Sequence, residues 1–341
     1  MRKFLFNFSA SYSGGGLKRL EEFSKCFNER GGCYFIIHEN CSFLIDKYKQ
    51  NRYFVVSQNM LSRLFNDCAY LDEIFHELNS IQFYYSYGIP IYGRYVEKQW
   101  FHLSNVAPLI PFKISLSLFD KIKCFVLGWK IKYYLVNYDY ISTESNFSSN
   151  FFKNHPACNS LVFTSVNGAD DEIEIFNSDI SNNKFLKQAV CVGTHKYKRI
   201  DRVFKIFLEL LIDEPELNLI IIGEIKGISK KILSHPRVKA RGIIARNEVI
   251  SCLLSSKYYI TATEVENSYN AASEGIFLSE YSFISSIQPH LELLKNLPYK
   301  KFKFKTLDDE VLFLKKDDLS AYNLKTWDEL INEMLADAGL L

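Results

Sequence analysis

The chain has 341 residues, of which 48% are hydrophobic, 23% charged and 15% aromatic. This composition excludes a disordered, collagen-like or simple coiled-coil protein, and the length suffices for two domains that each bury a core. Lys and Arg number 41 against 39 Asp and Glu, so the charge balance excludes a general electrostatic attraction to nucleic acid.

No apolar run approaches the roughly 18–20 residues that a membrane-spanning helix needs. The opening residues, MRKFLFNFSASYSGGG, lack the apolar core and cleavage site of a signal peptide, and we interpret them as a strand running into a glycine turn. The eight cysteines are scattered, without a C-x-x-C pair or a histidine at metal-ligand spacing. We therefore expect a cytoplasmic protein with reduced thiols and no bound metal.

Short apolar runs rich in Phe, Ile, Tyr and Val recur along the chain, as is typical of strands buried on both faces of a sheet. In the first half they cover residues 4–8, 33–38, 53–57, 81–85, 100–103, 138–142 and 161–166. In the second half they cover residues 189–193, 217–223, 238–244, 257–261 and 281–285. Helix-like spacing is found at residues 17–28, 202–211, 247–255 and 270–278. The alternation predicts an α/β fold with parallel sheets of Rossmann type.

A polar stretch at residues 172–187 separates two strand–helix series. We predict an N-terminal Rossmann-like domain at residues 1–180, a C-terminal Rossmann-like domain at residues 181–320, and a closing amphipathic helix within residues 321–341. Ligands of such sheets bind outside the carboxyl ends of the strands, so the residues that follow each predicted strand are the first candidates for a site.

A glycine run, Gly14-Gly15-Gly16, follows the first predicted strand and precedes a predicted helix. Glycine lets a backbone approach a ligand closely, and a helix N-terminus offers N–H groups to an anion. The run does not fit G-x-G-x-x-G, so dinucleotide binding is not predicted. A plain strand-to-helix turn is the alternative interpretation.

A basic turn follows the first predicted strand of the second half, in the sequence VGTHKYKRID. Gly193 opens it, and Lys196, Lys198 and Arg199 bring three cations to the mouth of the strand. Cations beside a helix N-terminus suit a diphosphate. A solvated basic turn is the alternative.

Two carboxylates, Glu266 and Glu274, stand in an E-x7-E arrangement after the predicted strand at residues 257–261. The spacing by itself is uninformative, since the pairs Glu21/Glu29 and Glu216/Glu224 share it. The placement is informative, because two carboxylates that flank a helix N-terminus can hold sugar hydroxyls while the N–H groups face phosphate.

Taken in order, these segments resemble the retaining glycosyltransferases of family 4, which have the GT-B fold, two Rossmann-like domains with a cleft between them. The matching segments are the glycines at residues 14–16, an N-G-x-D turn at 167–170, Gly193 to Lys198, Glu266 to Glu274, and a strand at 281–286 that leads to a Glu-containing segment at 287–292. The chain departs from the family at Thr194, where the family usually has Arg, and at residues 267–269, where it usually has Gly and Phe-Gly.

The resemblance implies that residues 1–180 form the acceptor domain and residues 181–320 the nucleotide-sugar donor domain. In the donor domain, Glu274 would bind the ribose of a nucleotide-sugar and Glu266 would lie against the donor sugar. Lys198, with Arg199 or Lys196 nearby, would hold the diphosphate. The candidate catalytic residues are Glu266 and His102, which ends the predicted strand at residues 100–103; a structural histidine is the alternative for His102. The implied donor-binding residues are Gly15, Gly16, Gly193, Lys198, Arg199, Asn270, Ala271 and Glu274.

The implied activity is that of a hexosyltransferase-type enzyme that moves a sugar from a nucleotide-sugar donor to a saccharide acceptor, lipid-linked in our interpretation, with retention. The implied setting is the assembly of O-antigen or capsule-type polysaccharide. No Asp-x-Asp occurs, which favours a metal-independent reaction without a cofactor. Two alternatives stay open: a nucleotide-sugar epimerase of the same architecture, and a catalytically silent GT-B-like partner subunit.

One segment carries a local charge bias. Residues 113–134 hold five Lys against one Asp, interleaved with large apolar residues. A basic amphipathic segment can lie on an anionic membrane, which would place the protein at the inner face of the cell membrane, beside a lipid-linked acceptor. A buried helix with solvated lysines is an equal alternative.

Overall fold

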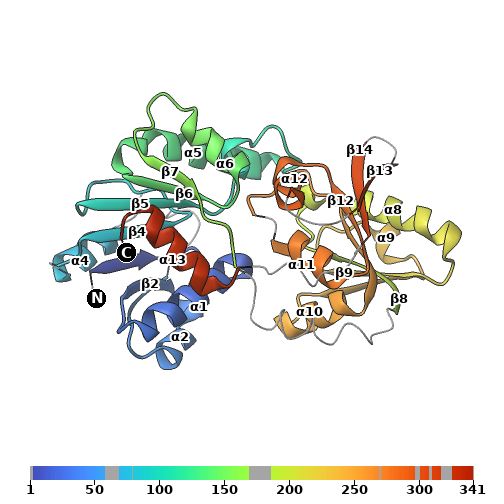
Figure 1. Ribbon diagram of the computed structural model, residues 1–341, viewed down its shortest axis with the longest axis horizontal. Coiled ribbons are helices and arrows are strands. Elements are labelled where there is room, and N and C mark those ends of the chain that lie inside the picture. Colours follow the sequence, from blue (N-terminus) through green and yellow to red (C-terminus); the bar gives the residue numbers. More distant parts are fainter. Residues whose placement is uncertain are drawn as a thin grey trace. The chain divides into compact units, whose positions relative to one another are not determined.

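In a computed structural model, the residues described are 3–57, 69–78, 80–168, 186–268, 270–295, 300–306, 309–315 and 325–340. The chain divides into two compact units, which we call the first and second domains (Figure 1). The first comprises residues 1–111, 117–168 and 325–341, and the second comprises residues 112–116 and 169–324. The predicted boundary at residues 180 and 181 lies outside the described residues.

The first domain contains a parallel sheet with the strand order β3-β2-β1-β4-β5-β6-β7. The chain starts in the middle of the sheet and proceeds to both edges, as in a doubly wound Rossmann-like sheet. The strands are β1 (Phe4–Asn7), β2 (Tyr34–His38), β3 (Arg52–Val56), β4 (Phe83–Tyr87), β5 (Lys98–Leu103), β6 (Tyr140–Thr143) and β7 (Leu161–Thr164). The α-helices between them are α1 (Gly14–Glu29), α2 (Phe43–Lys47), α4 (Ala69–Glu77), α5 (Leu118–Tyr133) and α6 (Asn146–Lys153).

Aromatic rings from β1, β2 and β4 pack against α1 to form the core of this domain. Phe6 on β1 lies 4.6 Å, between ring centroids, from Phe27 on α1. The closing helix is confirmed as α13 (Trp327–Asp337), whose Ile331 and Leu335 join the same core. The chain therefore returns to the first domain at its end, where α13 lies beside α1 (Figure 1).

The second domain has the strand order β10-β9-β8-β11-β12-β14-β13, with β8 to β12 parallel and the last two strands antiparallel. The strands are β8 (Leu186–Val192), β9 (Asn218–Ile222), β10 (Val238–Gly242), β11 (Ser256–Thr261), β12 (Tyr281–Ser285), β13 (Lys300–Thr306) and β14 (Asp309–Lys315). The α-helices are α8 (Ile200–Asp213), α9 (Lys230–Leu233), α10 (Arg246–Leu254), α11 (Asn270–Leu278) and α12 (Gln288–Leu294). The predicted helices are confirmed as α1, α8, α10 and α11.

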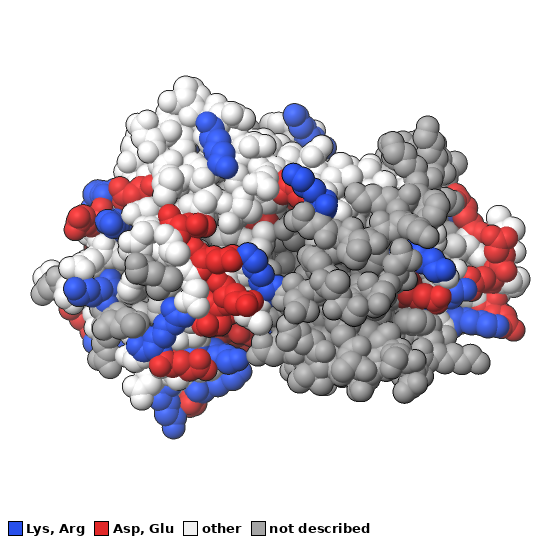
Figure 2. All heavy atoms as spheres, in the orientation of Figure 1, with Lys and Arg blue, Asp and Glu red and all other residues white. Residues whose placement is uncertain are grey.

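Charge is unevenly distributed on the face drawn in Figure 2. Acidic and basic side chains mix over the lower part of the first domain, whereas the surface over α5, at the top, is largely white.

Among the described residues, no helix is both long and apolar enough to cross a membrane. Within the same ranges, no group of three or more His, Cys, Asp or Glu side chains is placed to hold a metal ion.

Candidate functional site

The loop after β8 carries the residues predicted to bind a diphosphate. Gly193 has a φ of +90°, which favours glycine, and a Cβ there would lie 3.2 Å from Cε of Lys198. Thr194 donates a hydrogen bond of 2.7 Å to the backbone carbonyl of Glu224, beyond the end of β9. Glycine thus leaves room for the Lys198 stem across the loop, and Thr194 ties the loop to the neighbouring strand.

Two carboxylates follow β11, and each binds one cation of this loop. Glu266 forms an ion pair with Lys198, and the two side chains are only 18% and 12% exposed. Glu264 binds Arg199 at 2.6 Å and accepts two hydrogen bonds from Ser115, from the backbone N–H at 2.6 Å and from the hydroxyl at 2.8 Å. Arg199 therefore joins the loop to a structural carboxylate, whereas Lys198 faces the carboxylate of the E-x7-E pair.

The guanidinium of Arg199 has a second acidic partner. Its Nε and Nη2 donate to Asp201 at 3.0 and 2.8 Å, and these hydrogen bonds lower the pKa of Asp201. Burial alone would raise the pKa of Glu264, but its hydrogen bonds with Ser115 and Arg199 outweigh burial and lower it. Both carboxylates are ionised at neutral pH, so the charge of Arg199 is compensated within the protein.

Glu274 lies on α11, and a glycine fixes the position of this helix on β11. A Cβ on Gly275 would lie 2.3 Å from the Tyr259 ring, too close for any side chain. Glu274 receives both Nη atoms of Arg246, the first residue of α10, at 2.6 and 2.8 Å. This paired geometry fixes the plane of the carboxylate as well as its charge.

The two carboxylates of the E-x7-E pair both lie within electrostatic range of one buried tyrosine, Tyr259. Burial, with the negative charges of Glu266 and Glu274 adding to it, holds the pKa of Tyr259 well above its usual value. Asn270 and Ala271 form the first turn of α11, where backbone N–H groups lack partners within the helix. The structure thus brings together, in one domain, the residues that the sequence predicts around the end of β11.

His290 is a buried residue of this domain to which the sequence assigned no role. Its Nδ1 lies 2.9 Å from the backbone oxygen of Ser285, the last residue of β12. Burial lowers the pKa of His290 to about 4, with a smaller contribution in the same direction from the charge of Lys198. A neutral imidazole therefore lies within electrostatic range of Lys198.

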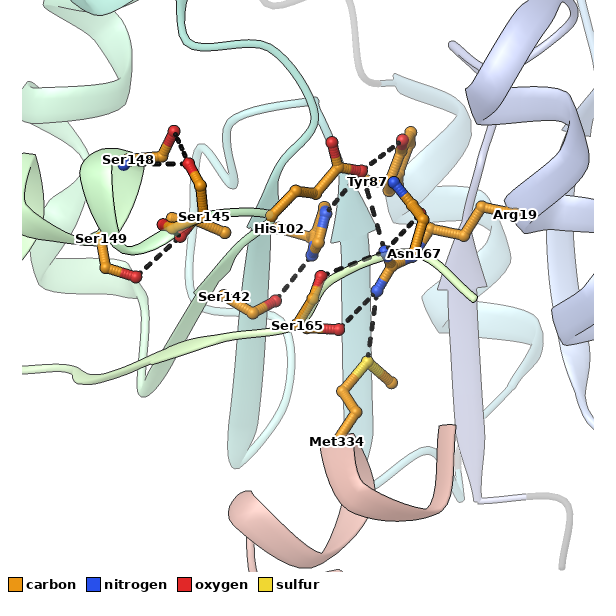
Figure 3. Close-up of polar contacts among 12 residues, drawn as sticks. Arg19, Tyr87, His102, Ser142, Ser145, Ser148, Ser149, Ser165, Asn167 and Met334 are labelled. Carbon is orange, nitrogen blue, oxygen red and sulfur yellow. Dashed lines mark hydrogen bonds and ion pairs between the residues drawn. The ribbon is translucent and has the colours of Figure 1, made fainter. Parts of the chain in front are cut away.

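In the first domain, a buried polar network lies at the carboxyl ends of the strands (Figure 3). Arg19 of α1 donates to the side-chain oxygens of Asn167 at 3.0 Å and Ser165 at 2.8 Å. Glu144, which follows β6, lies 3.8 Å from Nη1 of Arg19 and accepts a hydrogen bond of 3.2 Å from the hydroxyl of Tyr87. The network joins α1 to the ends of β4, β6 and β7. Of the predicted N-G-x-D turn, only Asn167 and Gly168 lie within the described residues.

His102, the predicted catalytic histidine, belongs to this network. Its ring is fully buried, stacks on Tyr87 at 5.0 Å between centroids, and places Nδ1 2.7 Å from the hydroxyl of Ser142 and Nε2 3.5 Å from Glu144. Burial, and then the charge of Arg19, lower the pKa of His102 to about 4. A neutral ring with protein partners on both nitrogens fits the structural alternative, and a catalytic role for His102 stays a prediction.

The three glycines after β1 form the first turn of α1, which begins at Gly14 and not at residue 17. Gly14 has a φ of +58°, and a Cβ on Gly16 would lie 3.2 Å from Ser11 and 3.3 Å from the Tyr87 ring. Gly16 therefore permits close packing of the helix start. Contact of Gly15 and Gly16 with a donor stays a prediction.

Acidification is expected to destabilise the protein through His102 and His290. Their pKa values of about 4 compare with an ordinary value of 6.5. As the pH falls from 6.5 to 4, the unfolded chain takes up protons that the folded protein does not, so stability falls, by on the order of 3 kcal/mol for each histidine over the full window.

Urea unfolding near pH 7 and at about pH 4.5, inside the window set by the two histidines, measures this loss. His290→Asn should lose less stability than the wild type between the two pH values. His76→Asn, at an exposed position on α4, is the control and should behave like the wild type. An equal loss in all three proteins would contradict the assignment.

Comparison with known proteins supports the fold. No family model matches the chain, and no curated protein matches it by sequence. HepE of Anabaena, solved in complex with UDP and glucose, is 14% identical, with a TM-score of 0.59 over 87% of this chain and 84% of that one. Sucrose-phosphate synthase of Thermosynechococcus elongatus is 9% identical, with a TM-score of 0.60 over 81% and 79%. The predicted fold is confirmed: two Rossmann-like domains, as in GT-B proteins.

Proposed function

We propose that this protein is a glycosyltransferase that transfers a sugar from a nucleotide-sugar to a saccharide acceptor. The proposal is carried by the cluster of Lys198, Glu266 and Glu274 around the end of β11, in the second domain of a GT-B fold. HepE of Anabaena was solved with UDP and glucose and also with UDP-glucose, at 12% identity and a TM-score of 0.55 in the second case. A nucleotide-sugar is therefore the donor class that we assign.

In this proposal, Glu274 binds the ribose. Arg246 takes one lone pair of each carboxylate oxygen of Glu274, and a carboxylate has about four such positions, so two remain for ribose hydroxyls. Glu266 faces the donor sugar, and its ion pair with Lys198 keeps that lysine beside the site before the donor binds. The pairing between Arg246 and Glu274 would thus be retained when the donor binds.

The diphosphate is assigned to Lys198 and to the N–H groups of Asn270 and Ala271 at the start of α11. Arg199 contributes less, because Glu264 and Asp201 already neutralise it. Cations and helix N–H groups aimed at the departing diphosphate stabilise the charge that develops on it in the transition state. Lys198 must then leave Glu266 for the phosphates, which frees that carboxylate for the sugar hydroxyls.

The finer assignments follow from the order of the motifs. We propose a hexosyltransferase that works with retention, in which the leaving diphosphate helps to deprotonate the attacking hydroxyl. The acceptor is a lipid-linked saccharide in the assembly of a surface polysaccharide. The enzyme then works in the cytoplasm, at the inner face of the cell membrane.

Two measurements test this function. Thermal-shift screening against UDP-, GDP-, ADP- and dTDP-sugars should show stabilisation by one nucleotide class. With that donor, nucleoside diphosphate should be released only when a saccharide acceptor is added. Conversion of the donor sugar without an acceptor would indicate the epimerase, and donor binding without any turnover across acceptors would indicate the silent partner subunit.

Turnover is expected to persist in excess EDTA. In the proposed site, Lys198 and the α11 N–H groups supply the positive charge at the leaving group, so a divalent cation is not needed for that task. Product formation with and without chelator measures this. Complete loss of activity that Mg²⁺ or Mn²⁺ restores would contradict the proposed chemistry.

A further inference from the structure

The helix α5 presents a row of large apolar side chains to solvent. Leu118, Ile122, Phe125, Trp129 and Tyr133 recur every three or four residues and are 74%, 55%, 52%, 55% and 62% exposed. This spacing places them on one face of the helix. We call these five residues the apolar stripe. In Figure 2, the surface over α5 is mostly white, the colour of uncharged residues, with isolated basic side chains in blue.

The opposite side of α5 is the one that packs on the first domain. A Cβ on Gly128 would lie 2.0 Å from the backbone oxygen of Pro108, so the helix backbone is in direct contact with that segment. Ile131 is buried, and Lys130 is buried with its ammonium 5.3 Å from the centre of the Tyr92 ring. The expectation of a solvated lysine is wrong for Lys130. The apolar stripe is therefore not the face by which α5 joins its own core.

The charges beside the stripe are positive. Lys121 lies one turn before Phe125, and Lys132 lies one turn after Trp129, so both flank the stripe. The single acidic residue of α5 is Asp120, in its first turn, which pairs with Lys123 at 3.7 Å. Large apolar side chains with a basic edge, including a Trp and a Tyr, match the chemistry of a bilayer interface with anionic headgroups.

We infer that the apolar stripe docks the protein on an anionic lipid surface, with its apolar side chains at the acyl boundary and Lys121 and Lys132 among the headgroups. A second copy of the chain is a poorer occupant. A self-complementary contact of stripe on stripe would bring the basic edges of both copies together without acidic partners. The proposed function already places the enzyme at the inner face of the cell membrane, and the inference deepens it by naming the surface that docks there. Such docking does not depend on which reaction the protein catalyses.

Sedimentation with phosphatidylcholine vesicles, with and without phosphatidylglycerol, tests the docking. The wild type should sediment with the phosphatidylglycerol vesicles, and added salt should weaken this binding without abolishing it. Ile122→Ser with Phe125→Ser should reduce vesicle partitioning about tenfold or more, because both side chains leave water on docking. The matched control is Ile212→Ser with Ile243→Ser, at the most exposed isoleucines among the described residues of the second domain, and should sediment like the wild type.

Two further arms separate the contributions. Lys121→Gln with Lys132→Gln should remove the preference for phosphatidylglycerol, leaving weaker binding to both kinds of vesicle. Trp129 emission should shift to shorter wavelength on vesicle addition, and Trp129→Phe should abolish the shift. Unchanged thermal midpoints and unchanged thermal shifts with nucleotide-sugars would show that the variants are folded. They also keep a failure of docking distinct from a failure of the proposed function.

Several results would overturn the inference. One is a wild type that stays in the supernatant with both kinds of vesicle. Another is equal sedimentation of the wild type and the Ile122→Ser, Phe125→Ser variant, which would mean that the protein binds the vesicles through charge alone and not through the apolar stripe. A third is wild-type self-association in analytical ultracentrifugation that the same variant abolishes, which would mean that a second copy covers the stripe.

Discussion

Replacing Glu274 with alanine is expected to weaken the binding of a nucleoside diphosphate by about 2–4 kcal/mol, the range for losing charge-assisted hydrogen bonds to a ribose. Calorimetry measures this loss. The fold should survive, because the side chain left without its partner is Arg246, which is 41% exposed and can be hydrated. Unchanged affinity would contradict the assignment of Glu274 to the ribose.

A matched control is available in the same domain. Glu216 shares the E-x7-E spacing with Glu224, but it lies just before β9 and pairs with Lys187, the second residue of β8, at the opposite ends of the strands. Glu216→Ala should therefore leave nucleotide affinity unchanged. If both variants weaken binding equally, a general loss of stability, and not a lost ribose contact, explains the result.

The 2′-deoxy form of the same nucleotide sharpens the test. The wild type should bind the ribose form more tightly, and Glu274→Ala should reduce that preference. Arg246→Ala should act in the same direction more weakly, because the carboxylate remains but its plane is no longer fixed. Equal losses for both nucleotide forms in Arg246→Ala would show that this arginine acts on the fold and not through Glu274.

Much of the fold could be predicted because the central strands of both sheets, such as β2, β4 and β9, are buried on both faces and therefore form continuous apolar runs. The hairpin of β13 and β14 was missed for the opposite reason. In β13, KKFKFKT, lysine alternates with apolar residues, a pattern typical of a strand at the edge of a sheet. A search for continuous runs cannot detect such a strand, and its antiparallel pairing departs from the repeated strand–helix unit.

The site was predictable only where sequence order fixes geometry. Glu266 and Glu274 flank one strand end and the next helix, so their proximity follows from local structure. The pairing of Ser115 with Glu264 joins residues 149 positions apart, and that of Arg246 with Glu274 spans 28. No spacing rule connects such residues, because the packing of the whole domain determines which of them meet.

The buried network of the first domain shows the same limit. His102 could be noticed because it lies near the end of an apolar run, but its partner Glu144 follows a different strand. Arg19 lies in the amphipathic helix α1, where an arginine is ordinarily expected at the surface, yet it is almost fully buried. It is held there by contacts with Ser165 and Asn167, which lie 146 and 148 positions further along the sequence.

Replacing Glu144 with glutamine is expected to destabilise the first domain by about 3–5 kcal/mol, because it leaves the buried charge of Arg19 without its carboxylate. The three tryptophans, Trp100, Trp129 and Trp327, all belong to this domain. Tryptophan fluorescence during urea unfolding therefore reports on the first domain without interference from the second.

An exposed ion pair and a double variant serve as controls for the loss of stability in Glu144→Gln. Glu77→Gln removes an ion pair with Arg52 in which both side chains are about half exposed, and it should cost less than about 1 kcal/mol. Adding Arg19→Met to Glu144→Gln should cost less than the sum of the single changes, because the double variant no longer buries an uncompensated charge. Strictly additive losses would mean that Arg19 and Glu144 contribute independently, through their separate hydrogen bonds.

The difference in unfolding free energy between the wild type and Glu144→Gln should also depend on pH. Burial raises the pKa of Glu144, but its hydrogen bond with His102 and the charge of Arg19 outweigh burial and lower it. A carboxylate with a lowered pKa stabilises the folded state above its ordinary pKa and loses that contribution as the pH falls through the folded value. The wild type should therefore exceed Glu144→Gln in free energy of unfolding by the full amount at neutral pH, and by less in acid. If the difference in unfolding free energy does not change with pH, the missing charge is not what destabilises the variant.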